Sequence, residues 1–233
     1  MPIILDLDGT LFDTTAREAR CRKGGRMDWE CWFNPINLML DRVNNDVLEF
    51  AKRLNEPVII VSGRIRELQE EATIVQLTGL GLNINGIYLK PKAWQFVKEH
   101  AYKAWMIIHL STHGILINHV IDDNPKVLDT AYAVLEEFGQ PRPRLWLVKN
   151  GRPVEYEPAS RPIGWIGLDN GVKGLKAGCG IEYILRIVKS GDAYYALCID
   201  NGVELRPTGI DVLTAIVNGG NWVSPIVQPP GGP

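Results

Sequence analysis

The chain has 233 residues, of which 45% are hydrophobic and 22% are charged, so it has the composition of a globular protein with one large domain, or one domain and a small second one. Its net charge of -2 excludes a broad basic field for binding nucleic acid, so any nucleic-acid contact must be local. No stretch approaches the roughly 18 apolar residues that span a membrane. The N-terminus reaches Asp6 too soon for a signal peptide, which predicts a cytoplasmic protein.

Short apolar runs alternate with stretches of helical periodicity in the first 150 residues. Strands are predicted at 3–7, 58–62, 86–89, 119–122 and 144–148. Helices are predicted at about 38–54, 65–80, 93–110 and 125–138. This alternation predicts an α/β fold with a doubly wound parallel sheet, in which binding sites form at the carboxyl ends of the strands.

Composition changes after residue 150, where most of the glycines and none of the four histidines lie. We expect a first domain at 1–152, a linker at 153–162, a small α+β module at 163–227 and a disordered tail at 228–233. In the module, strands are predicted at 181–189, 193–200 and 203–206, followed by a short helix from Thr208 or Asp211. Its aromatic and basic residues suit either single-stranded nucleic acid or, in our preferred interpretation, core packing and self-association.

The four cysteines form no C-x-x-C pair and have no histidine at zinc-ligand spacing. They are Cys21, Cys31, Cys179 and Cys198. We therefore expect reduced, unpaired thiols. His109, His113 and His119 lie among apolar residues, which favours packed or surface histidines over metal ligands.

Polar residues follow three of the predicted strands. They form the segments Asp6-Leu7-Asp8-Gly9-Thr10, Ser62-Gly63-Arg64 and Asp122-Asp123-Asn124. Asp6 and Asp8 place two carboxylates near one opening, and a divalent cation such as Mg²⁺ relieves their repulsion. A single D-x-D can instead be a turn whose side chains cap backbone amides. The two further strand-end segments favour a functional site.

The segment from Ile4 to Asp13 resembles the first motif of the haloacid dehalogenase superfamily of phosphotransferases. Ser62-Gly63-Arg64 and Val120-Ile121-Asp122-Asp123 resemble its second and fourth motifs, in family order. With Asp28-Trp29 and Trp32-Phe33, the chain is most similar to the phosphatase domain of phage polynucleotide kinase-phosphatases. The resemblance covers residues 2 to about 150 and implies a Rossmann-like fold of the superfamily type.

The resemblance implies a role for each aspartate. Asp6 is expected to be the nucleophile that forms an aspartyl-phosphate, and Asp8 the general acid and then the general base. Mg²⁺ is expected to bind Asp6, the backbone carbonyl of Asp8 and Asp123, with Asp122 close behind. Thr10 and Ser62 offer hydroxyl and backbone donors to the transferring phosphoryl group.

The third motif of the superfamily supplies a cation, for which we favour Lys103, with Lys98 as the alternative. Gly63, Arg64 and Arg17 complete the expected phosphate-binding residues. The two arginines suit this role because a guanidinium donates to two phosphate oxygens at once. Glu99 stands where the related phosphatases have an aspartate, and its role is left open.

A basic run follows the first motif. It consists of Arg17, Arg20, Arg22, Lys23 and Arg26. It is either a solvated surface or a contact for a nucleic-acid backbone. The chain has no G-x-x-x-x-G-K-[ST] segment, so a P-loop kinase half is not expected.

The sequence thus predicts a Mg²⁺-dependent phosphomonoester hydrolase acting on a nucleic-acid 3′ end or a nucleotide. A phosphatase of small metabolites with the same fold is the first alternative. A non-catalytic nucleic-acid-binding protein that retains the fold is the second. An open basic groove would favour a polymer, and a covered pocket a metabolite.

Overall fold

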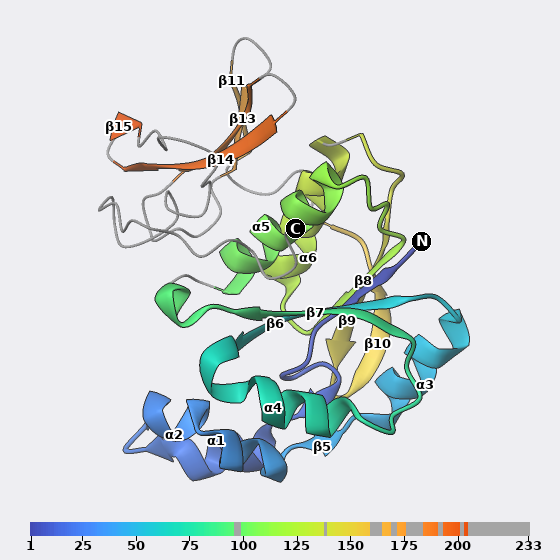
Figure 1. The fold of residues 1–233 in the computed structure, drawn as a ribbon, viewed down its shortest axis with the longest axis vertical. Coiled ribbons are helices and arrows are strands. Elements are labelled where there is room, and N and C mark those ends of the chain that lie inside the picture. The colour runs from blue at the N-terminus through green and yellow to red at the C-terminus, as the bar shows by residue number, and fades with distance from the viewer. Residues whose placement is uncertain are drawn as a thin grey trace.

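The computed structural model describes residues 1–95, 99–137 and 139–158 continuously, and then the strands 165–168, 172–175, 184–190, 193–200 and 203–204. Its main feature is a six-stranded sheet with helices on both faces (Figure 1). No helix in these ranges is long and apolar enough to cross a membrane.

The sheet has the strand order β10-β9-β8-β1-β6-β7. The short strand β1 (Ile3–Leu5) lies between β6 (Val58–Ile65) and β8 (His119–Asp122) and pairs with both in parallel. On the outer sides, β7 (Ile84–Lys90) and β9 (Arg144–Lys149) are also parallel to their inner neighbours. The predicted α/β fold with a mostly parallel sheet is therefore confirmed.

Alternate residues of the strands supply two separate cores. Ile4, Ile59 and Val120 pack with residues of α5 (Glu99–Thr112) and α6 (Pro125–Glu137). Ile3, Leu5 and Ile60 pack with residues of α3 (Asn45–Leu54) and α4 (Arg66–Leu77). Figure 1 shows these two helix pairs on opposite faces of the sheet. Burial on both faces explains why these strands are almost continuously apolar.

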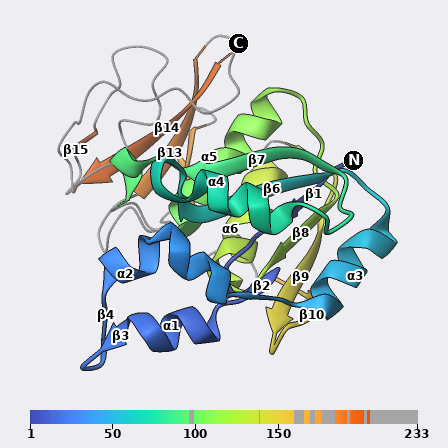
Figure 2. The same cartoon turned by 60° about the horizontal axis from the view of Figure 1, so that its bottom comes forward.

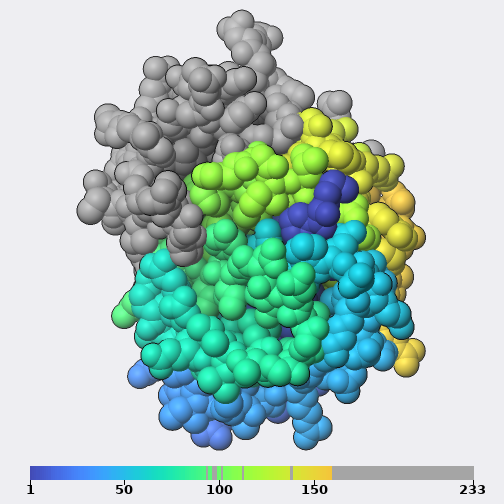
Figure 3. Space-filling view, turned by 45° about the vertical axis from the view of Figure 1, so that its right-hand side comes forward, coloured from blue at the N-terminus to red at the C-terminus, as the bar shows by residue number. Residues whose placement is uncertain are grey.

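The chain between β1 and α3 forms an insertion of short elements. In chain order they are β2 (Phe12–Asp13), α1 (Thr15–Cys21), β3 (Arg22–Lys23), β4 (Arg26–Met27), α2 (Trp29–Phe33), the 3-10 helix η1 (Pro35–Leu40) and β5 (Arg42–Val43). Figure 2 shows α1 and α2 side by side. In the space-filling view, the blue segment that contains them lies at the bottom of the picture (Figure 3).

The predicted helix at 38–54 is partly wrong. Its first residues belong to η1 and β5, and α3 begins only at Asn45. The Asn44 side chain donates to the backbone carbonyl of Thr10, at 2.6 Å, which fixes the chain in an extended conformation just before the helix. Because of this tertiary contact, the helix begins later than the apolar periodicity of the sequence predicts.

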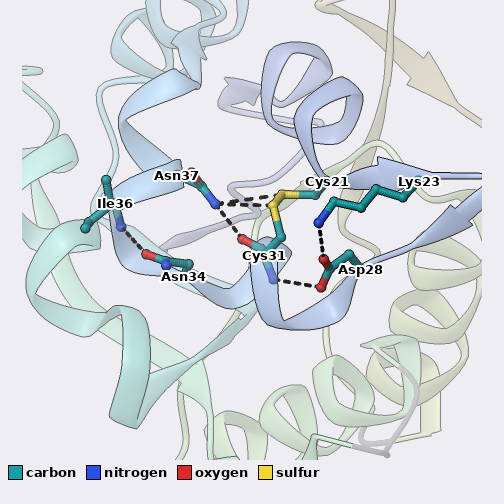
Figure 4. Close-up of a disulfide and its surroundings, with 7 residues drawn as sticks. All are labelled: Cys21, Lys23, Asp28, Cys31, Asn34, Ile36 and Asn37. Carbon is teal, nitrogen blue, oxygen red and sulfur yellow. Dashed lines mark hydrogen bonds and ion pairs between the residues drawn. A yellow bond between two sulfur atoms is a disulfide. The ribbon is translucent and has the colours of Figure 1, made fainter.

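The expectation of unpaired thiols is wrong for Cys21 and Cys31, which form a disulfide (Figure 4). Packing of α1 against α2 brings their Cα atoms to 5.4 Å, within the range that a disulfide spans. Asn37 donates to the backbone carbonyl of Cys31 at 2.8 Å. The disulfide therefore fastens α2 to the end of α1. Cys179 lies outside the described residues.

Arg152–Tyr156, where the linker is predicted to begin, instead forms β10 and pairs antiparallel with β9. Farther along, the structure describes an antiparallel sheet with the order β11-β12-β13-β14-β15. Its strands are β11 (Trp165–Leu168), β12 (Val172–Leu175), β13 (Ile184–Ser190), β14 (Ala193–Asp200) and β15 (Val203–Glu204). The last three match the strands predicted from sequence, whereas β11 and β12 were not predicted. The predicted helix from Thr208 or Asp211 and the tail lie outside the described residues.

Candidate functional site

The site begins where β1 ends at the centre of the sheet. The Asp6 amide donates to the carbonyl of Ile121 in β8, at 3.1 Å, and the chain then turns at Gly9. Gly9 has a φ of 82°, and a Cβ there would lie 2.5 Å from the Asp123 carboxylate. Glycine is therefore required both by the backbone conformation and by the close approach of the two loops.

Lys103 connects the acidic residues at the ends of β1 and β8. Its Nζ lies 2.8 Å from Asp6 Oδ1 and 2.7 Å from Asp122 Oδ2, and its side chain is only 2% exposed. One helical turn earlier, Glu99 approaches the same Nζ at 2.6 Å. Burial opposes a charge on Lys103, but Asp122, Asp6 and Glu99 outweigh it and raise the pKa of Lys103. The lysine preferred from sequence is thus placed at the aspartates, while Lys98 lies outside the described residues.

Asp6, Asp122 and Asp123 form an acidic cluster, in which one carboxylate oxygen of each residue lies within 4.8 Å of those of the other two. Burial raises the pKa of all three carboxyl groups, and Lys103 offsets only part of this effect. Asp6 Oδ2 is buried and has no hydrogen-bond partner among the described residues. Three carboxylates with one lysine leave excess negative charge, and hard oxygen ligands of this kind fit Mg²⁺.

Thr10 links the loop after β1 to Asp123. Its hydroxyl accepts a hydrogen bond from the Asp123 amide at 2.9 Å and lies 3.4 Å from Asp123 Oδ1. Its own amide donates to the carbonyl of Leu7. The predicted donation from Thr10 to a phosphoryl group stays a prediction.

Ser62 and Gly63 lie in the second half of β6. The Ser62 side chain is buried, and its Oγ accepts a weak hydrogen bond from the Arg64 amide at 3.4 Å. Gly63 lines the cavity described below. A Cβ on Gly63 would lie 3.1 Å from the carboxyl carbon of Glu99, so glycine lets β6 and α5 approach closely.

Arg17 and Arg64 both bind Asp8. Asp8 Oδ1 lies 2.7 Å from Arg17 Nη2 and 2.8 Å from Arg64 Nη2, and both arginine side chains are completely buried. Burial opposes ionisation of Asp8, but Arg64 and Arg17 outweigh it and lower the pKa of Asp8. Both arginines were predicted to bind phosphate, which stays a prediction; in this structure both hold the carboxylate of Asp8.

Asp41 is a site residue that the sequence analysis missed. Its buried carboxylate lies 3.0 Å from Arg17 Nη2 and 3.4 Å from Arg64 Nη2, the same two nitrogens that contact Asp8, so it helps to position both guanidinium groups. Burial raises the pKa of Asp41 to about 7, although Arg17 lowers it. Between Leu40 and Arg42, its local sequence gives no sign of burial.

A cavity of about 1010 Å³ opens over Asp8, Gly9 and Asp123. Its lining also includes three aromatic residues of α2, Trp29, Trp32 and Phe33. Besides Asp8 and Asp123, the lining includes Glu30, Glu99 and a single lysine, Lys90. The described part of the cavity is therefore acidic and aromatic, and it is not a basic groove.

The remainder of the basic run lies outside this cavity. Arg20, Arg22, Lys23 and Arg26 are exposed on α1 and on the β3–β4 hairpin. Arg22 pairs with Glu18, and Lys23 with Asp28 at 2.9 Å.

His109 and His119 are buried, whereas His113 is exposed, in line with the prediction of packed or surface histidines. His109 stacks on Trp105, with ring centroids 5.4 Å apart. Nδ1 of His119 accepts a hydrogen bond from Trp146 at 2.9 Å.

The chain matches no family model, and no curated protein or solved structure matches it significantly.

Proposed function

We propose that the protein is a Mg²⁺-dependent phosphomonoester hydrolase that acts through an aspartyl-phosphate on a nucleic-acid 3′ end or a nucleotide. The observation that carries the proposal is the buried set of Asp6, Lys103 and Asp122, which adjoins Asp123 beneath a large cavity. The resemblance of the three strand-end motifs to those of haloacid dehalogenase phosphatases supports the same chemistry.

Asp6 is the nucleophile in this proposal. Its carboxylate oxygen attacks phosphorus, and the bond from phosphorus to the leaving oxygen breaks as the aspartyl-phosphate forms. Lys103, at 2.8 Å, orients Asp6 and favours its ionised form. Asp6, Asp123 and the backbone carbonyl of Asp8 would hold Mg²⁺, with Asp122 behind them. The bound ion would neutralise charge on the phosphoryl oxygens.

Asp8 moves the protons. It gives its proton to the leaving oxygen in the first step, and in the second it takes a proton from the water that releases inorganic phosphate from Asp6. Arg17 and Arg64 keep Asp8 ionised in the free protein, which suits the second step. For the first step, Asp8 must first take up a proton from solvent or from the monoanionic phosphate ester, and the negative charge of the bound phosphoryl group favours this uptake.

Replacement of Asp6 tests the proposal. Asp6→Asn keeps the shape of the side chain but forms no aspartyl-phosphate, so Mg²⁺-dependent release of inorganic phosphate should disappear while the protein stays folded. Asp46→Asn is the matched control, because Asp46 is an exposed aspartate that pairs with Arg152 away from the site. Mg²⁺-dependent activity of Asp6→Asn equal to that of the control would refute the assignment.

Replacement of Asp123 tests the metal. Asp123→Ala should raise the Mg²⁺ concentration needed for half-maximal activity, because one oxygen ligand is lost. Ca²⁺ should inhibit the unmodified protein, since its larger and more flexible coordination shell does not impose the same geometry. Full phosphatase activity in the presence of a chelator would contradict a metal-dependent mechanism.

A second candidate is a phosphatase of small metabolites. It is favoured by the lining of the cavity, where Asp8, Glu30, Glu99 and Asp123 outnumber Lys90. A nucleic-acid backbone adds several phosphates, and the described lining offers only Lys90 as a cation to bind them. Comparing kcat/KM for a 3′-phosphorylated oligonucleotide, a mononucleotide and a sugar phosphate over a range of salt distinguishes the candidates. Binding of the oligonucleotide without hydrolysis of any substrate would favour a non-catalytic protein.

A further inference from the structure

The side chains of Trp29, Trp32 and Phe33 form what we call the aromatic wall of the cavity. Their spacing of three and four residues places them on one side of α2. The rings of Trp29 and Phe33 stack with centroids 5.8 Å apart and planes 22° apart. Trp29 is nevertheless 60% exposed, a large apolar surface left in contact with water beside a polar site. Ligand pockets commonly combine aromatic side chains with a few polar groups, which is the combination found here.

The aromatic wall is held in place before any ligand arrives. Asp28 caps α2 by accepting a hydrogen bond from the Cys31 amide at 3.1 Å. The Cys21–Cys31 disulfide ties α2 to α1 (Figure 4). The Arg17 guanidinium lies 4.0 Å above the centre of the Trp32 ring. The same Arg17 also binds Asp8, so one side chain contacts both the aromatic wall and the acid–base residue.

The chemistry of the lining selects the group that can cover the wall. Aromatic rings stack on planar groups, and the carboxylate of Glu30, in the same helix as the wall, accepts hydrogen bonds from amino groups. Nucleobases combine a planar face with amino donors at the edge. A second phosphate would instead meet the acidic lining. The volume of about 1010 Å³ is at the upper end of ligand pockets, roughly 300 to 1000 Å³.

We propose that the aromatic wall is a base-stacking site, which takes the nucleobase of the nucleotide whose phosphate lies at Asp6 and Asp123. This inference rests on the proposed function, which supplies the position of the phosphate. A mononucleotide and the 3′-terminal nucleotide of a strand present the same base and the same phosphate. The site recognises one nucleotide unit in either case, and any further phosphates of a strand lie outside the cavity.

Replacement of Trp29 tests the proposal. Base–aromatic stacking contributes about 1 to 3 kcal/mol per base, so Trp29→Ala should weaken binding of a nucleoside monophosphate by roughly 5- to 150-fold. Trp29→Phe should retain most of the affinity. Ile36→Ala is the matched control, because Ile36 is an exposed apolar residue just after α2 and is absent from the described lining. Binding is measured calorimetrically with Mg²⁺ on the Asp6→Asn background, in which no turnover occurs.

Ligands without a base make the result specific. Binding of ribose 5-phosphate should be the same for Trp29→Ala and the control, and equal weakening of ribose 5-phosphate and nucleotide would overturn the proposal. Unphosphorylated nucleosides test the wall without the phosphate. If they bind and Trp29→Ala abolishes this binding while no phosphate ester is hydrolysed, the wall is a base site and only the proposed function fails.

Two nucleotide sources are compared in parallel. A 3′-phosphorylated oligonucleotide is matched with one whose 3′-terminal residue is abasic, and a mononucleotide is matched with ribose 5-phosphate. A Trp29-dependent advantage of the base in the oligonucleotide pair identifies a strand end as a ligand, and the same advantage in the mononucleotide pair identifies a free nucleotide. If the base gives no advantage in either pair, the wall is not a base site.

Discussion

Lys103→Met is the substitution with the largest expected effect on stability in the absence of metal. Methionine fills a similar space but leaves the carboxylates of Asp6 and Asp122 buried without their common cation. Two unit charges about 2.8 Å apart interact by about 6 kcal/mol at an effective dielectric constant of about 20. Desolvation of the ammonium group costs several kcal/mol and offsets part of this attraction. The free energy of unfolding should therefore fall by about 3 to 5 kcal/mol, the usual cost of removing one partner of a buried ion pair.

The assay is thermal or denaturant unfolding in the presence of a chelator. For a domain of this size, 1 kcal/mol corresponds to about 2 to 4 °C, so the melting temperature should fall by roughly 6 to 20 °C. Lys126→Met is the control, because Lys126 is exposed on α6. In the variant, the stability should also fall as the pH rises, since Asp6 and Asp122 have raised pKa values and must ionise without their partner.

Mg²⁺ gives a second readout for the same variant. If the cluster of Asp6, Asp122 and Asp123 binds Mg²⁺, the ion restores part of the stability that Lys103→Met loses, because it supplies positive charge to the same carboxylates. Phosphatase activity should remain low, since Asp6 is no longer oriented. A melting temperature of Lys103→Met within 2 °C of the Lys126→Met value would refute our account of the electrostatics.

Three further predictions concern residues around the site. Asp8→Asn should reduce hydrolysis of alkyl phosphates far more than that of an activated aryl phosphate, whose leaving oxygen needs little protonation; equal losses on the two substrates would count against Asp8 as the acid. Replacing both Cys21 and Cys31 by alanine should lower the free energy of unfolding by about 2 to 3 kcal/mol, because the disulfide closes a loop with a sequence separation of 10. A reductant should produce the same loss in the unmodified protein and none in the variant, and an unmodified protein that the reductant leaves unchanged would contradict this. Burial lowers the pKa of His109 from 6.5 to about 4, so the unfolded state binds more protons and stability is lost, by up to about 3 kcal/mol, as the pH falls from 6.5 toward 4. In His109→Phe this acid sensitivity should be smaller in denaturant unfolding, and an unchanged pH dependence would show that another group is responsible.

The parallel core was predictable because its strands are continuous apolar runs that end in polar residues. Val58–Ser62 is an example: it lies within β6, and the polar Ser62 follows the apolar part. Each such strand is buried on both faces, so its sequence is determined by burial alone and can be recognised without knowing its neighbours. The same property placed Asp6 and Asp122 at one edge of the sheet, since parallel neighbours end together.

The insertion between β1 and α3 was not predictable in the same way. Its elements are two to seven residues long, too short for periodicity to identify. Asp41 is buried because η1 packs against α4, where Gln76 donates to the carbonyl of Leu38 at 2.5 Å. The disulfide likewise depends on how α1 meets α2. Each of these features arises from contacts between short segments, and no single segment encodes them.

The support of Asp8 connects this insertion to the chemistry. Arg17 comes from α1 and Arg64 from the end of β6, and Asp41, just after η1, holds both. A ligand that stacks on the aromatic wall therefore contacts the segment that positions Arg17, because Trp32 lies against the same guanidinium. If the base and the phosphate bind together, the base contacts the aromatic wall, and Trp32 connects this contact to Arg17. The position of Arg17 relative to Asp8 would then depend on whether a base is bound. Selectivity in this protein would then reside in the rate of phosphate release as well as in affinity, and Trp29→Ala should lower kcat for a nucleotide without changing kcat for ribose 5-phosphate.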